Sequence, residues 1–448
     1  MQIDRPDLHP DWIDDHAYGI VKALQKAGFT SYLVGGCVRD LLLGVHPKDF
    51  DIATSAHPNQ VKRLIHMAFV IGKRFRLVLV KRNDQQYEVA TFRKDPEPTE
   101  LTDNRAAHDS HSDPADDPAD DPADDAGAEA SFEEDSEANA PLQTIKVDDN
   151  VFGTPEEDAR RRDFTINALF YDPVANTLID YVNGAADIEA RLLRVIGDPD
   201  IRLREDPIRM FRALRLSHKL NLRIEDTLRQ SMAKNAPLIT ASVLPRRREE
   251  FLKLMRLAQP TRALLEAHDL GILQNAFPTF AKLLSLPDGP LALELNLEAL
   301  KGLVSDWNSP LEIFFWSVSS LSMALRELGE SASPDELLVA MRDELGMHKH
   351  EITTTFEAYR IHILLGRSED LKRKGDRRKA ALVSRDGFDL AIGLAEHGSF
   401  LGPETVMFWR ELRSHMQGSV DLKKNKVRLA RSKRNRRKSG RNPFEKEQ

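Results

Sequence analysis

The chain has only one cysteine, Cys37, among its 448 residues. A single cysteine excludes an intrachain disulfide and a cysteine-based zinc site, and it fits a reducing compartment. No apolar stretch approaches the roughly 18 residues that a membrane-spanning helix needs. The N-terminal segment MQIDRPDLHPDWIDD is acidic and has no apolar core, so it is not a signal peptide. We therefore expect a cytoplasmic protein that is long enough for two to four domains.

The net charge of −7 conceals a strong segregation of charge along the sequence. Residues 103–137 are rich in carboxylates and have Arg105 as their only Lys or Arg, whereas residues 423–441 contain eleven Lys or Arg and no acid. The repeat DPADDPADDPADD has almost no apolar content, so burial cannot offset the entropy of ordering it. We predict an acidic disordered insertion over residues 99–147 and a basic tail over residues 421–448. The alternatives are a metal-binding or counter-charge insertion and a merely solvated terminus.

Periodicity divides the rest of the chain into an α/β part and a helical part. The α/β part comprises residues 1–98 and 148–198, and the helical part comprises domains at residues 199–265 and 266–420. The expected elements of the α/β part are a helix at 11–27, the strands SYLVGG and FDIAT, a polar helix at roughly 58–68, and the hairpins RFRLVLVKR/YEVATFR and LFYDP/TLIDYV. A capping box at Thr154-Pro155-Glu156-Glu157 predicts a helix that continues through DFTINALF.

The segment LVGGCVRDLLLGVHPKDFDIAT holds the first candidate site. Asp49 and Asp51 are two residues apart on a predicted strand, so both project from the same face. Adjacent carboxylates repel each other unless they share a cation, and carboxylate oxygens suit Mg²⁺. Two such ions can activate an attacking hydroxyl and stabilise a leaving oxygen. Gly35 and Gly36 allow backbone N–H groups to approach phosphate at a helix start. A solvated Asp-x-Asp and an ordinary Gly-Gly turn are the alternatives.

A second candidate site begins at Asp206-Pro207, where we predict the start of a helix. Asp206, Arg209 and Arg212 recur at three-residue spacing, which places them on one helical face. A carboxylate accepts hydrogen bonds from an exocyclic amine and a guanidinium donates to ring nitrogens, so this face could recognise a base. The alternative is an N-cap aspartate followed by solvent-facing arginines on an amphipathic helix.

Several of these motifs together resemble a known family. LVGGCVRDLLLG followed by KDFDIAT resembles the head domain of the polymerase-β-like nucleotidyltransferases. Within them, it resembles the class that joins bacterial poly(A) polymerases with CCA-adding enzymes. The resemblance continues through RRDFTINAL (161–169), DYVNGAADIEARLLRVIG (180–197) and REDPIRMFRALRL (204–216). It implies an α+β fold, with a mixed-sheet head, an all-helical C-terminal half and a basic disordered tail.

The resemblance also implies roles for individual residues. It implies metal ligands at Asp49 and Asp51, with Asp163 as the third catalytic acid. Glu88, on the predicted strand YEVATF, is a rival for the third position, and the closer motif match favours Asp163. Contacts with ATP are implied for Gly35, Gly36, Arg39, Arg162, Asp206, Arg209 and Arg212, and Glu205 belongs to the same base-selecting motif.

The segment VIGKRFRLVLV (70–80) resembles the stretch that marks the bacterial poly(A) polymerases, although Lys73 stands where arginine is commoner. The resemblance thus implies transfer of AMP from ATP to RNA 3′ ends with two Mg²⁺ ions (Mn²⁺ being possible), in the service of mRNA turnover. No membrane or DNA partner is expected. An arginine-rich tail would hold RNA through its phosphates, with the contacts expected at Lys433, Arg434, Arg436, Arg437 and Lys438. The alternatives are a CCA-adding tRNA nucleotidyltransferase and a catalytically silent RNA-binding protein.

Overall fold

The computed structural model describes residues 2–4, 10–72, 77–83, 85–94, 151–398 and 400–416. The predicted acidic insertion and the basic tail lie outside these described residues. The chain forms two compact units. We call Met1–Arg162 with Asn167–Val182 the head unit, and Asp163–Ile166 with Asn183–Gln448 the helical unit. The finer domain boundaries at residues 198 and 265 stay predictions.

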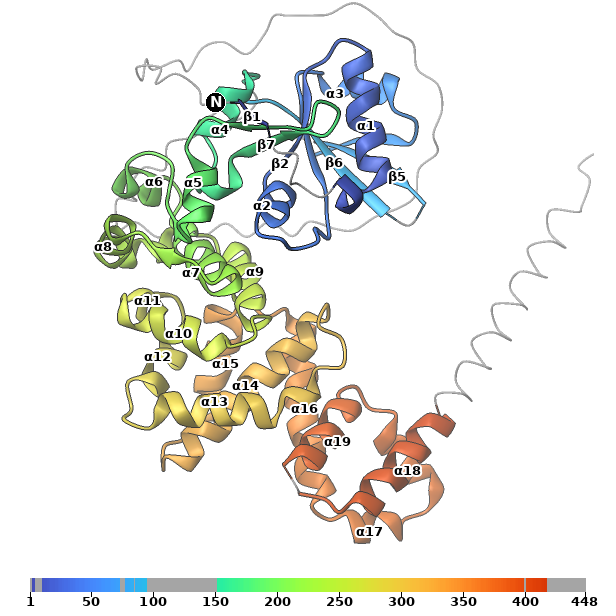
Figure 1. Cartoon of the computed structure of the whole chain (residues 1–448). Coiled ribbons are helices and arrows are strands. Elements are labelled where there is room, and N and C mark those ends of the chain that lie inside the picture. Colours follow the sequence, from blue (N-terminus) through green and yellow to red (C-terminus); the bar gives the residue numbers. More distant parts are fainter. Residues whose placement is uncertain are drawn as a thin grey trace, which may run out of the picture. The chain divides into compact units, whose positions relative to one another are not determined.

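An eight-stranded mixed sheet forms the head unit (Figure 1). Its strand order is β1-β8-β7-β2-β3-β6-β5-β4, and only β3 and β6 pair in parallel among the described strands of this sheet. The strands are β1 (Gln2–Asp4), β2 (Ser31–Val34), β3 (Asp51–Thr54), β4 (Ala68–Ile71), β5 (Leu77–Arg82), β6 (Gln85–Thr91), β7 (Leu169–Asp172) and β8 (Thr177–Asp180). The prediction of a mixed sheet is therefore confirmed.

The helices of the head unit are short and follow local sequence signals. They are the 3₁₀ turn η1 (Pro10–Trp12) and the helices α1 (Asp15–Lys26), α2 (Gly36–Leu42), α3 (Pro58–Leu64) and α4 (Pro155–Arg160). Asp14 caps α1 by accepting from the backbone N–H groups of His16 and Ala17. The buried side of α1 packs on β2, and α1 also contacts α3 (Figure 1). The capping box predicted at Thr154 starts α4.

Three aromatic rings form part of the core of the head unit. Tyr32 of β2, Phe92 at the end of β6 and Phe170 of β7 lie 6.0–6.2 Å apart between ring centroids. Edge-on and tilted rings at this spacing attract each other in addition to burying apolar area. The cluster joins strands on both sides of β3, so it fixes the strand that carries the candidate carboxylates.

Two predicted helices are shorter than expected. The polar helix ends at Leu64, because Met67 adopts a left-handed backbone conformation (φ 57°) and Ala68–Ile71 pair with β5 as an edge strand. The helix that starts at Thr154 ends at Arg160, because the following residues bond elsewhere in the fold. Phe164 forms a β-bridge with Val195, and the Thr165 hydroxyl donates to Asp187 (2.6 Å). Tertiary pairing overrides local periodicity at both places.

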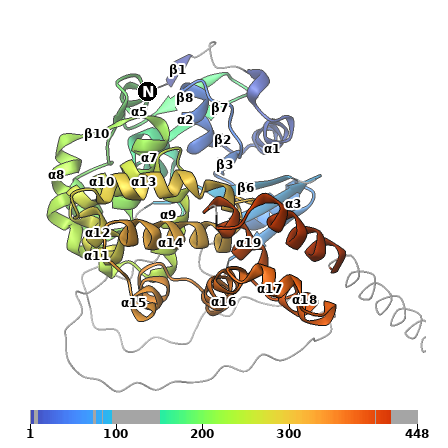
Figure 2. The same ribbon diagram turned by 90° about the horizontal axis from the view of Figure 1, so that it is seen from below.

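The helical unit consists mostly of helices, as the fold class predicts. It also has a small parallel pair, β9 (Leu192–Leu193) with β10 (Arg223–Ile224), and helices α13 and α14 run side by side (Figures 1 and 2). Its α-helices are α5 (Gly184–Glu189), α6 (Pro199–Glu205), α7 (Arg209–Leu220), α8 (Asp226–Asn235), α9 (Leu244–Met255), α10 (Pro260–Asp269), α11 (Ile272–Ala276), α12 (Pro278–Leu284), α13 (Gly289–Ala299), α14 (Pro310–Glu327), α15 (Pro334–Val339), α16 (Lys349–Leu365), α17 (Ser368–Lys372), α18 (Asp376–Val383) and α19 (Phe388–His397). Short 3₁₀ or π turns complete it at η3 (Ala236–Ala241), η4 (Lys301–Leu303) and η5 (Ala340–Glu344), and residues 403–416 are also helical. The 3₁₀ turn η2 (Thr165–Asn167) spans the boundary between the two units.

Within the described ranges, no helix combines the length and the apolar content needed to cross a bilayer. The cytoplasmic location stays a prediction. Cys37 is a buried residue whose thiol donates to the carbonyl of Val34 (3.3 Å), in agreement with a packing role.

A buried ion pair joins α9 to α16 inside the helical unit. The Arg248 guanidinium donates two hydrogen bonds to the Glu351 carboxylate (3.1 and 2.9 Å) and stacks over the Phe314 ring of α14. The side chains are only 8% and 3% exposed. Two charges so far from water stabilise the fold only as a pair.

Glu351→Ala is expected to lower the free energy of unfolding by about 3–5 kcal/mol, because the Arg248 charge then stays buried without its partner. Urea denaturation of the full chain measures the change. The matched control is Asp226→Ala, which breaks the exposed Arg223–Asp226 pair and is expected to lose less than about 1 kcal/mol. Equal losses in the two variants would contradict the role of the buried pair.

Candidate active site

The two aspartates of the first candidate site lie where β3 begins. Asp51 is the first residue of β3 and pairs with Val34, the last residue of β2. The prediction that Asp49 lies on the strand is wrong, because β3 begins at Asp51, opposite the residue at which β2 ends. Phe50 is buried between the two, and both aspartates are exposed. The alternation of exposed and buried side chains that the Asp-x-Asp spacing predicts is therefore present, although only Asp51 belongs to the strand.

Glu88 lies opposite Asp51 in the parallel pair of β3 and β6. The pKa of Asp51 is raised to about 6, first by desolvation and then by the charges of Glu88 and Asp49, while the charge of Arg162 lowers it. The carboxylates of Asp49 and Glu88 thus both act on Asp51. This concentration of negative charge is what a bound cation would relieve.

The Gly35-Gly36 turn joins β2 to α2 beside these acids. Gly35 has a φ of 77°, and a Cβ built there would lie 3.3 Å from Nη1 of Arg162. Glycine is therefore favoured by the backbone conformation, and any other residue would also place its Cβ in tight contact with the neighbouring guanidinium. Arg39 is buried against this turn, where its guanidinium donates to Asp40 (2.6 and 2.8 Å) and to the side-chain oxygen of Asn167 (2.6 Å). In this structure Arg39 stabilises the turn through these hydrogen bonds, and its contact with a triphosphate stays a prediction.

Arg162 is held on several sides within the head unit. Its guanidinium donates to the Asp158 carboxylate (2.9 and 3.1 Å) and to the carbonyl of Asn167 (3.3 Å), and it lies over the Phe170 ring. Because it also acts on the pKa of Asp51, this cation connects the carboxylates with the glycine turn.

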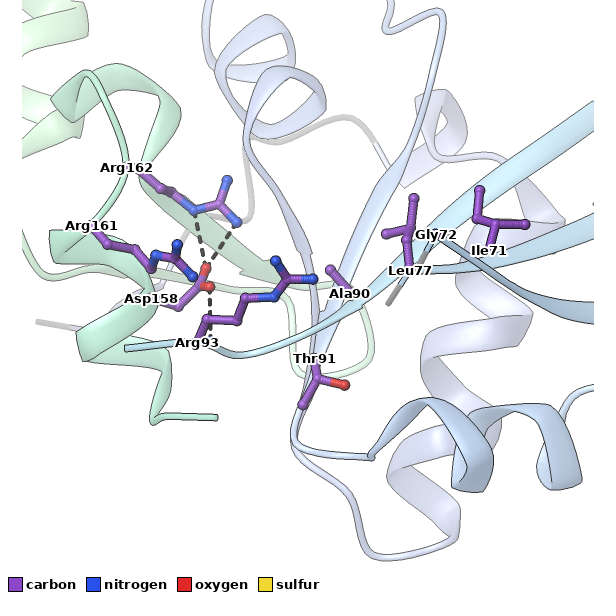
Figure 3. Close-up of a pocket in the computed structure, with 9 residues that line it drawn as sticks. All are labelled: Ile71, Gly72, Leu77, Ala90, Thr91, Arg93, Asp158, Arg161 and Arg162. Atoms are coloured by element: carbon purple, nitrogen blue, oxygen red, sulfur yellow. Dashed lines mark hydrogen bonds and ion pairs between the residues drawn. The ribbon is translucent and has the colours of Figure 1, made fainter. Parts of the chain in front are cut away.

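A cavity of about 500 Å³ opens in the head unit (Figure 3). It is lined by β-strand residues on one side and by α4 with the residues that follow it on the other. The described lining residues are Ile71, Gly72, Leu77, Ala90, Thr91, Arg93, Asp158, Arg161 and Arg162.

Asp163 belongs to the helical unit, and the boundary between the units falls directly before it. It is buried, its carboxylate accepts from the backbone N–H of Phe164 (2.8 Å), and it forms an ion pair with Arg212 (2.8 Å). The structure therefore brings together two residues that the sequence assigned to different motifs.

The prediction of one helical face for the base-selecting residues is wrong for Asp206. α6 ends at Glu205, and α7 begins only at Arg209, so Asp206 lies in the turn between them. Pro207 explains this, since the residue before a proline is disfavoured in the helical conformation. Arg209 and Arg212 do share α7, and Arg209 donates to the Arg202 carbonyl (2.6 Å) and to Glu205 (3.1 Å).

Sequence reasoning missed Arg246 in this second site. From α9 it donates two hydrogen bonds of 2.8 Å to the two carboxylate oxygens of Asp206. It is the first of three successive arginines, and nothing in such a run indicates which partner each member takes. The tail residues expected to bind RNA (Lys433, Arg434, Arg436, Arg437 and Lys438) lie outside the described part of the chain.

In the described ranges, no three His, Cys, Asp or Glu side chains come close enough to hold a metal ion by themselves. Mg²⁺ does not need such a cage, because it takes one or two carboxylates and completes its shell with water and substrate phosphates. The charges of Asp49 and Glu88 act on Asp51 and raise its pKa, which indicates an excess of negative charge of the kind that such an ion neutralises. The residues present therefore fit a divalent cation.

Comparison with known proteins supports the architecture. Residues 31–194 match the family described as Poly A polymerase head domain, and residues 221–284 match the probable RNA and SrmB-binding site of polymerase A. Poly(A) polymerase I of Salmonella typhi is 31% identical over 430 residues, which cover 92% of this chain and 81% of that protein. Poly(A) polymerase I of Haemophilus influenzae is 35% identical over 295 residues, or 66% of this chain and 58% of the relative, so the match spans little more than half of the relative's length.

CCA-adding enzymes are also similar to the chain. The enzyme of Lactobacillus helveticus is 32% identical over 53% of this chain and 49% of its own length. Among solved structures, the Bacillus stearothermophilus CCA-adding enzyme in complex with CTP has a TM-score of 0.55 at 22% identity and covers 90% of this chain and 82% of its own. An apo form of a CCA-adding enzyme has a TM-score of 0.58 at 18% identity, with 92% and 86% covered.

The mixed-sheet head and the helices that follow it are the fold of a nucleotidyltransferase, an enzyme class. The chain belongs to the family of nucleotidyltransferases that bacterial poly(A) polymerases share with CCA-adding enzymes.

Asp51→Asn is expected to raise the thermal midpoint of the metal-free protein by a few degrees at about pH 7.5. The pKa of Asp51 is raised to about 6 in the folded state, so its ionisation disfavours folding. This destabilisation is fully present above that pKa and disappears as the pH falls to the ordinary value near 4. Calorimetry in a chelator at both pH values measures the difference, which should vanish at about pH 4. An equal difference at both values would contradict the assignment.

Proposed function

We propose that the chain is a poly(A) polymerase that transfers AMP from ATP to the 3′-hydroxyl of RNA and releases pyrophosphate. The observation that carries this proposal is the group of carboxylates at the start of β3, opposite Glu88 and beside the Gly35-Gly36 turn. Similarity to poly(A) polymerase I over 92% of the chain supports AMP as the transferred group. Tailing of this kind would serve mRNA turnover.

Asp49, Asp51 and Glu88 are the residues that would hold divalent ions, which we propose to be two Mg²⁺ (or Mn²⁺) ions. When bound there, such ions would supply Lewis-acid stabilisation of charge at the reacting phosphate. The protein's own contribution is to bring these carboxylates together at the start of β3. The Arg162 guanidinium assists by lowering the pKa of Asp51.

The triphosphate of ATP would lie at the Gly35-Gly36 turn. The absence of side chains lets phosphate oxygens approach the backbone N–H groups there, and Arg162 lies within reach of Gly35. The bonds from Arg162 to Asp158 and Asn167 fix its guanidinium before substrate arrives. A cation that is already oriented loses little entropy when it binds phosphate, and it neutralises charge that grows on the departing pyrophosphate.

We propose Glu88, in preference to Asp163, as the third catalytic carboxylate. Glu88 is the direct neighbour of Asp51 in the sheet and acts on its pKa. Asp163 is buried and bonded to Arg212, so we propose that it positions this arginine.

Asp206, Arg209 and Arg212 would recognise adenine. Arg246 holds both carboxylate oxygens of Asp206, which fixes the orientation of the acceptor that an exocyclic amine would meet. Arg209 is similarly fixed by Glu205 and the Arg202 carbonyl. RNA would be held by the helical unit, where residues 221–284 match an RNA-binding region, and by the basic tail.

CCA addition to tRNA is the second candidate function. The observation in its favour is the similarity to CCA-adding enzymes, one of which, from Thermotoga maritima, is known in complex with a tRNA. The segment at residues 70–80 and the greater coverage by poly(A) polymerases favour AMP polymerisation.

Incubation with ATP alone is expected to add long AMP tails to an unstructured RNA primer. Asp49→Ala and Asp51→Ala are expected to abolish incorporation while RNA binding survives, because the metal site is lost and the RNA contacts are not. Gel analysis of labelled primer measures both tail length and nucleotide choice. Addition that needs CTP plus ATP and a tRNA without its 3′ end would assign CCA addition. No pyrophosphate release by the wild type would leave only an RNA-binding role.

Glu88→Gln and Asp163→Asn are expected to fail in different ways. Loss of a metal ligand lowers kcat, so Glu88→Gln should resemble Asp51→Ala, with little change in the KM for ATP. Asp163→Asn releases Arg212 and should chiefly raise the KM for ATP, by roughly tenfold, since a charge-assisted bond is lost. Steady-state kinetics with varied ATP separate the two effects. The opposite pattern would make Asp163 the third carboxylate.

A further inference from the structure

The cavity of the head unit has two chemically different walls (Figure 3). Among the described lining residues, the guanidinium groups of Arg93, Arg161 and Arg162 lie on one side with a single carboxylate, that of Asp158. Ile71, Gly72 and Leu77 of the β4–β5 edge form the other side. The lining is therefore cationic opposite an apolar surface, which suits a nucleotide with its phosphate on one wall and its ribose or base on the other.

The floor of the cavity connects it to the catalytic carboxylates. Ala90 lies two residues after Glu88 on β6, so both side chains project from the same face of the sheet. Glu88 in turn lies opposite Asp51. The cavity thus adjoins the group of acids without containing them.

The order of strands places the cavity and the glycine turn on opposite sides of Asp51. β3 lies between β2, which leads into Gly35-Gly36, and β6, which continues to β5 and β4. The turn is on the β2 side, and the strand residues that line the cavity are on the β6 side, while Arg162 lines the cavity and also lies against Gly35 of the turn. Two binding places therefore flank the reacting centre.

In-line phosphoryl transfer requires the attacking oxygen and the leaving oxygen to be on opposite sides of the phosphorus. If the triphosphate lies at the glycine turn, the RNA 3′-hydroxyl must approach from the β6 side. We propose that the cavity is the site for the 3′-terminal part of the RNA strand, with Arg93 and Arg161 holding the internucleotide phosphate nearest the 3′ end and Ile71 and Leu77 contacting its sugar or base. This inference rests on the proposed function.

The chemistry of the lining also fits a strand of any sequence. A guanidinium binds a phosphodiester through two parallel N–H groups and takes no account of the base. The one hydroxyl among the described lining residues, that of Thr91, donates to the Ala56 carbonyl (2.7 Å). A polymerase that starts on varied RNA ends and then continues on its own adenosine tail needs a binding site that does not depend on the identity of the base.

The first test compares three neighbouring arginines. Arg93→Gln and Arg161→Gln are each expected to raise the KM for an RNA primer roughly tenfold and to change the KM for ATP less than twofold. Arg160→Gln is the matched control, since Arg160 is adjacent in sequence, is exposed and does not line the cavity. Its primer KM should stay at the wild-type value. Arg161→Lys should recover part of the loss, because it keeps the charge.

The second test modifies the primer and works even if one variant fails to fold. A methylphosphonate replaces the phosphate at the last, the second or the third linkage from the 3′ end, which removes one negative charge at a time. The wild type should lose roughly tenfold in kcat/KM at the last linkage and less at the others. In Arg161→Gln, the same modification should have little further effect, because the two changes remove one interaction.

Several results would overturn the inference while AMP incorporation by the wild type continues. One is a raised KM for ATP with an unchanged primer KM, which would assign the cavity to ATP. Another is a loss of kcat/KM on the methylphosphonate primer that is as large in Arg161→Gln as in the wild type, because the two changes would then act independently. An unchanged primer KM in both Arg93→Gln and Arg161→Gln would overturn it too. A wild type that incorporates no AMP would instead overturn the proposed function itself.

Discussion

Electrostatic repulsion at the only parallel strand pair of the described head sheet is the constraint around which the site is organised. β3 and β6 bring Asp51 and Glu88 into register, and Asp49 adds a third charge just before the strand. Desolvation of Asp51, together with these neighbouring charges, raises its pKa and therefore destabilises the folded protein above that pKa when no cation is bound. A fold keeps this kind of strain where function uses it, and the use that we propose here is the capture of divalent ions between protein and phosphate.

The positive charge of Arg162 partly compensates for this repulsion, and much of the neighbouring structure holds the Arg162 side chain in place. Asp158 accepts from it, Asn167 accepts from both Arg162 and Arg39, and Phe170 supports its guanidinium. Asp158 also accepts from the backbone N–H of Arg93 (3.1 Å). One buried network therefore fixes the glycine turn and the cationic wall of the cavity together, so a change at Asp158 would disturb both.

Local spacing in the sequence was enough to find some of this site, and long-range pairing decided the rest. Asp49, Asp51 and the Gly35-Gly36 turn are close in sequence, so strand alternation and turn chemistry revealed them. The partnership of Asp51 with Glu88 depends on a parallel pairing between residues that are 37 positions apart in the sequence, which periodicity does not encode.

The second candidate site also shows that spacing in the sequence does not determine which distant residue a side chain bonds. Asp206-Pro207 is compatible both with a helix start and with a helix end, and the structure has both, since α6 ends at Glu205 and α7 begins at Arg209. Arg246 and Arg248 stand in one basic run, yet the first bonds Asp206 and the second is buried against Glu351. A run of like charges looks like a solvated surface in sequence, and only the packed helices reveal that its members have separate partners.

The two proposed substrate contacts differ in rigidity for a physical reason. Without a template, the enzyme selects the base only through its own donors and acceptors, and discrimination is strong when a wrong base leaves those groups unpaired. A carboxylate that rotates freely can adapt to a wrong base, whereas Asp206 is fixed at both oxygens by Arg246. The RNA end needs no such selection, so charge and apolar surface suffice there. Fixed polar groups for the incoming nucleotide and an unselective cavity for the growing strand are together what a tail of one nucleotide on many RNAs requires.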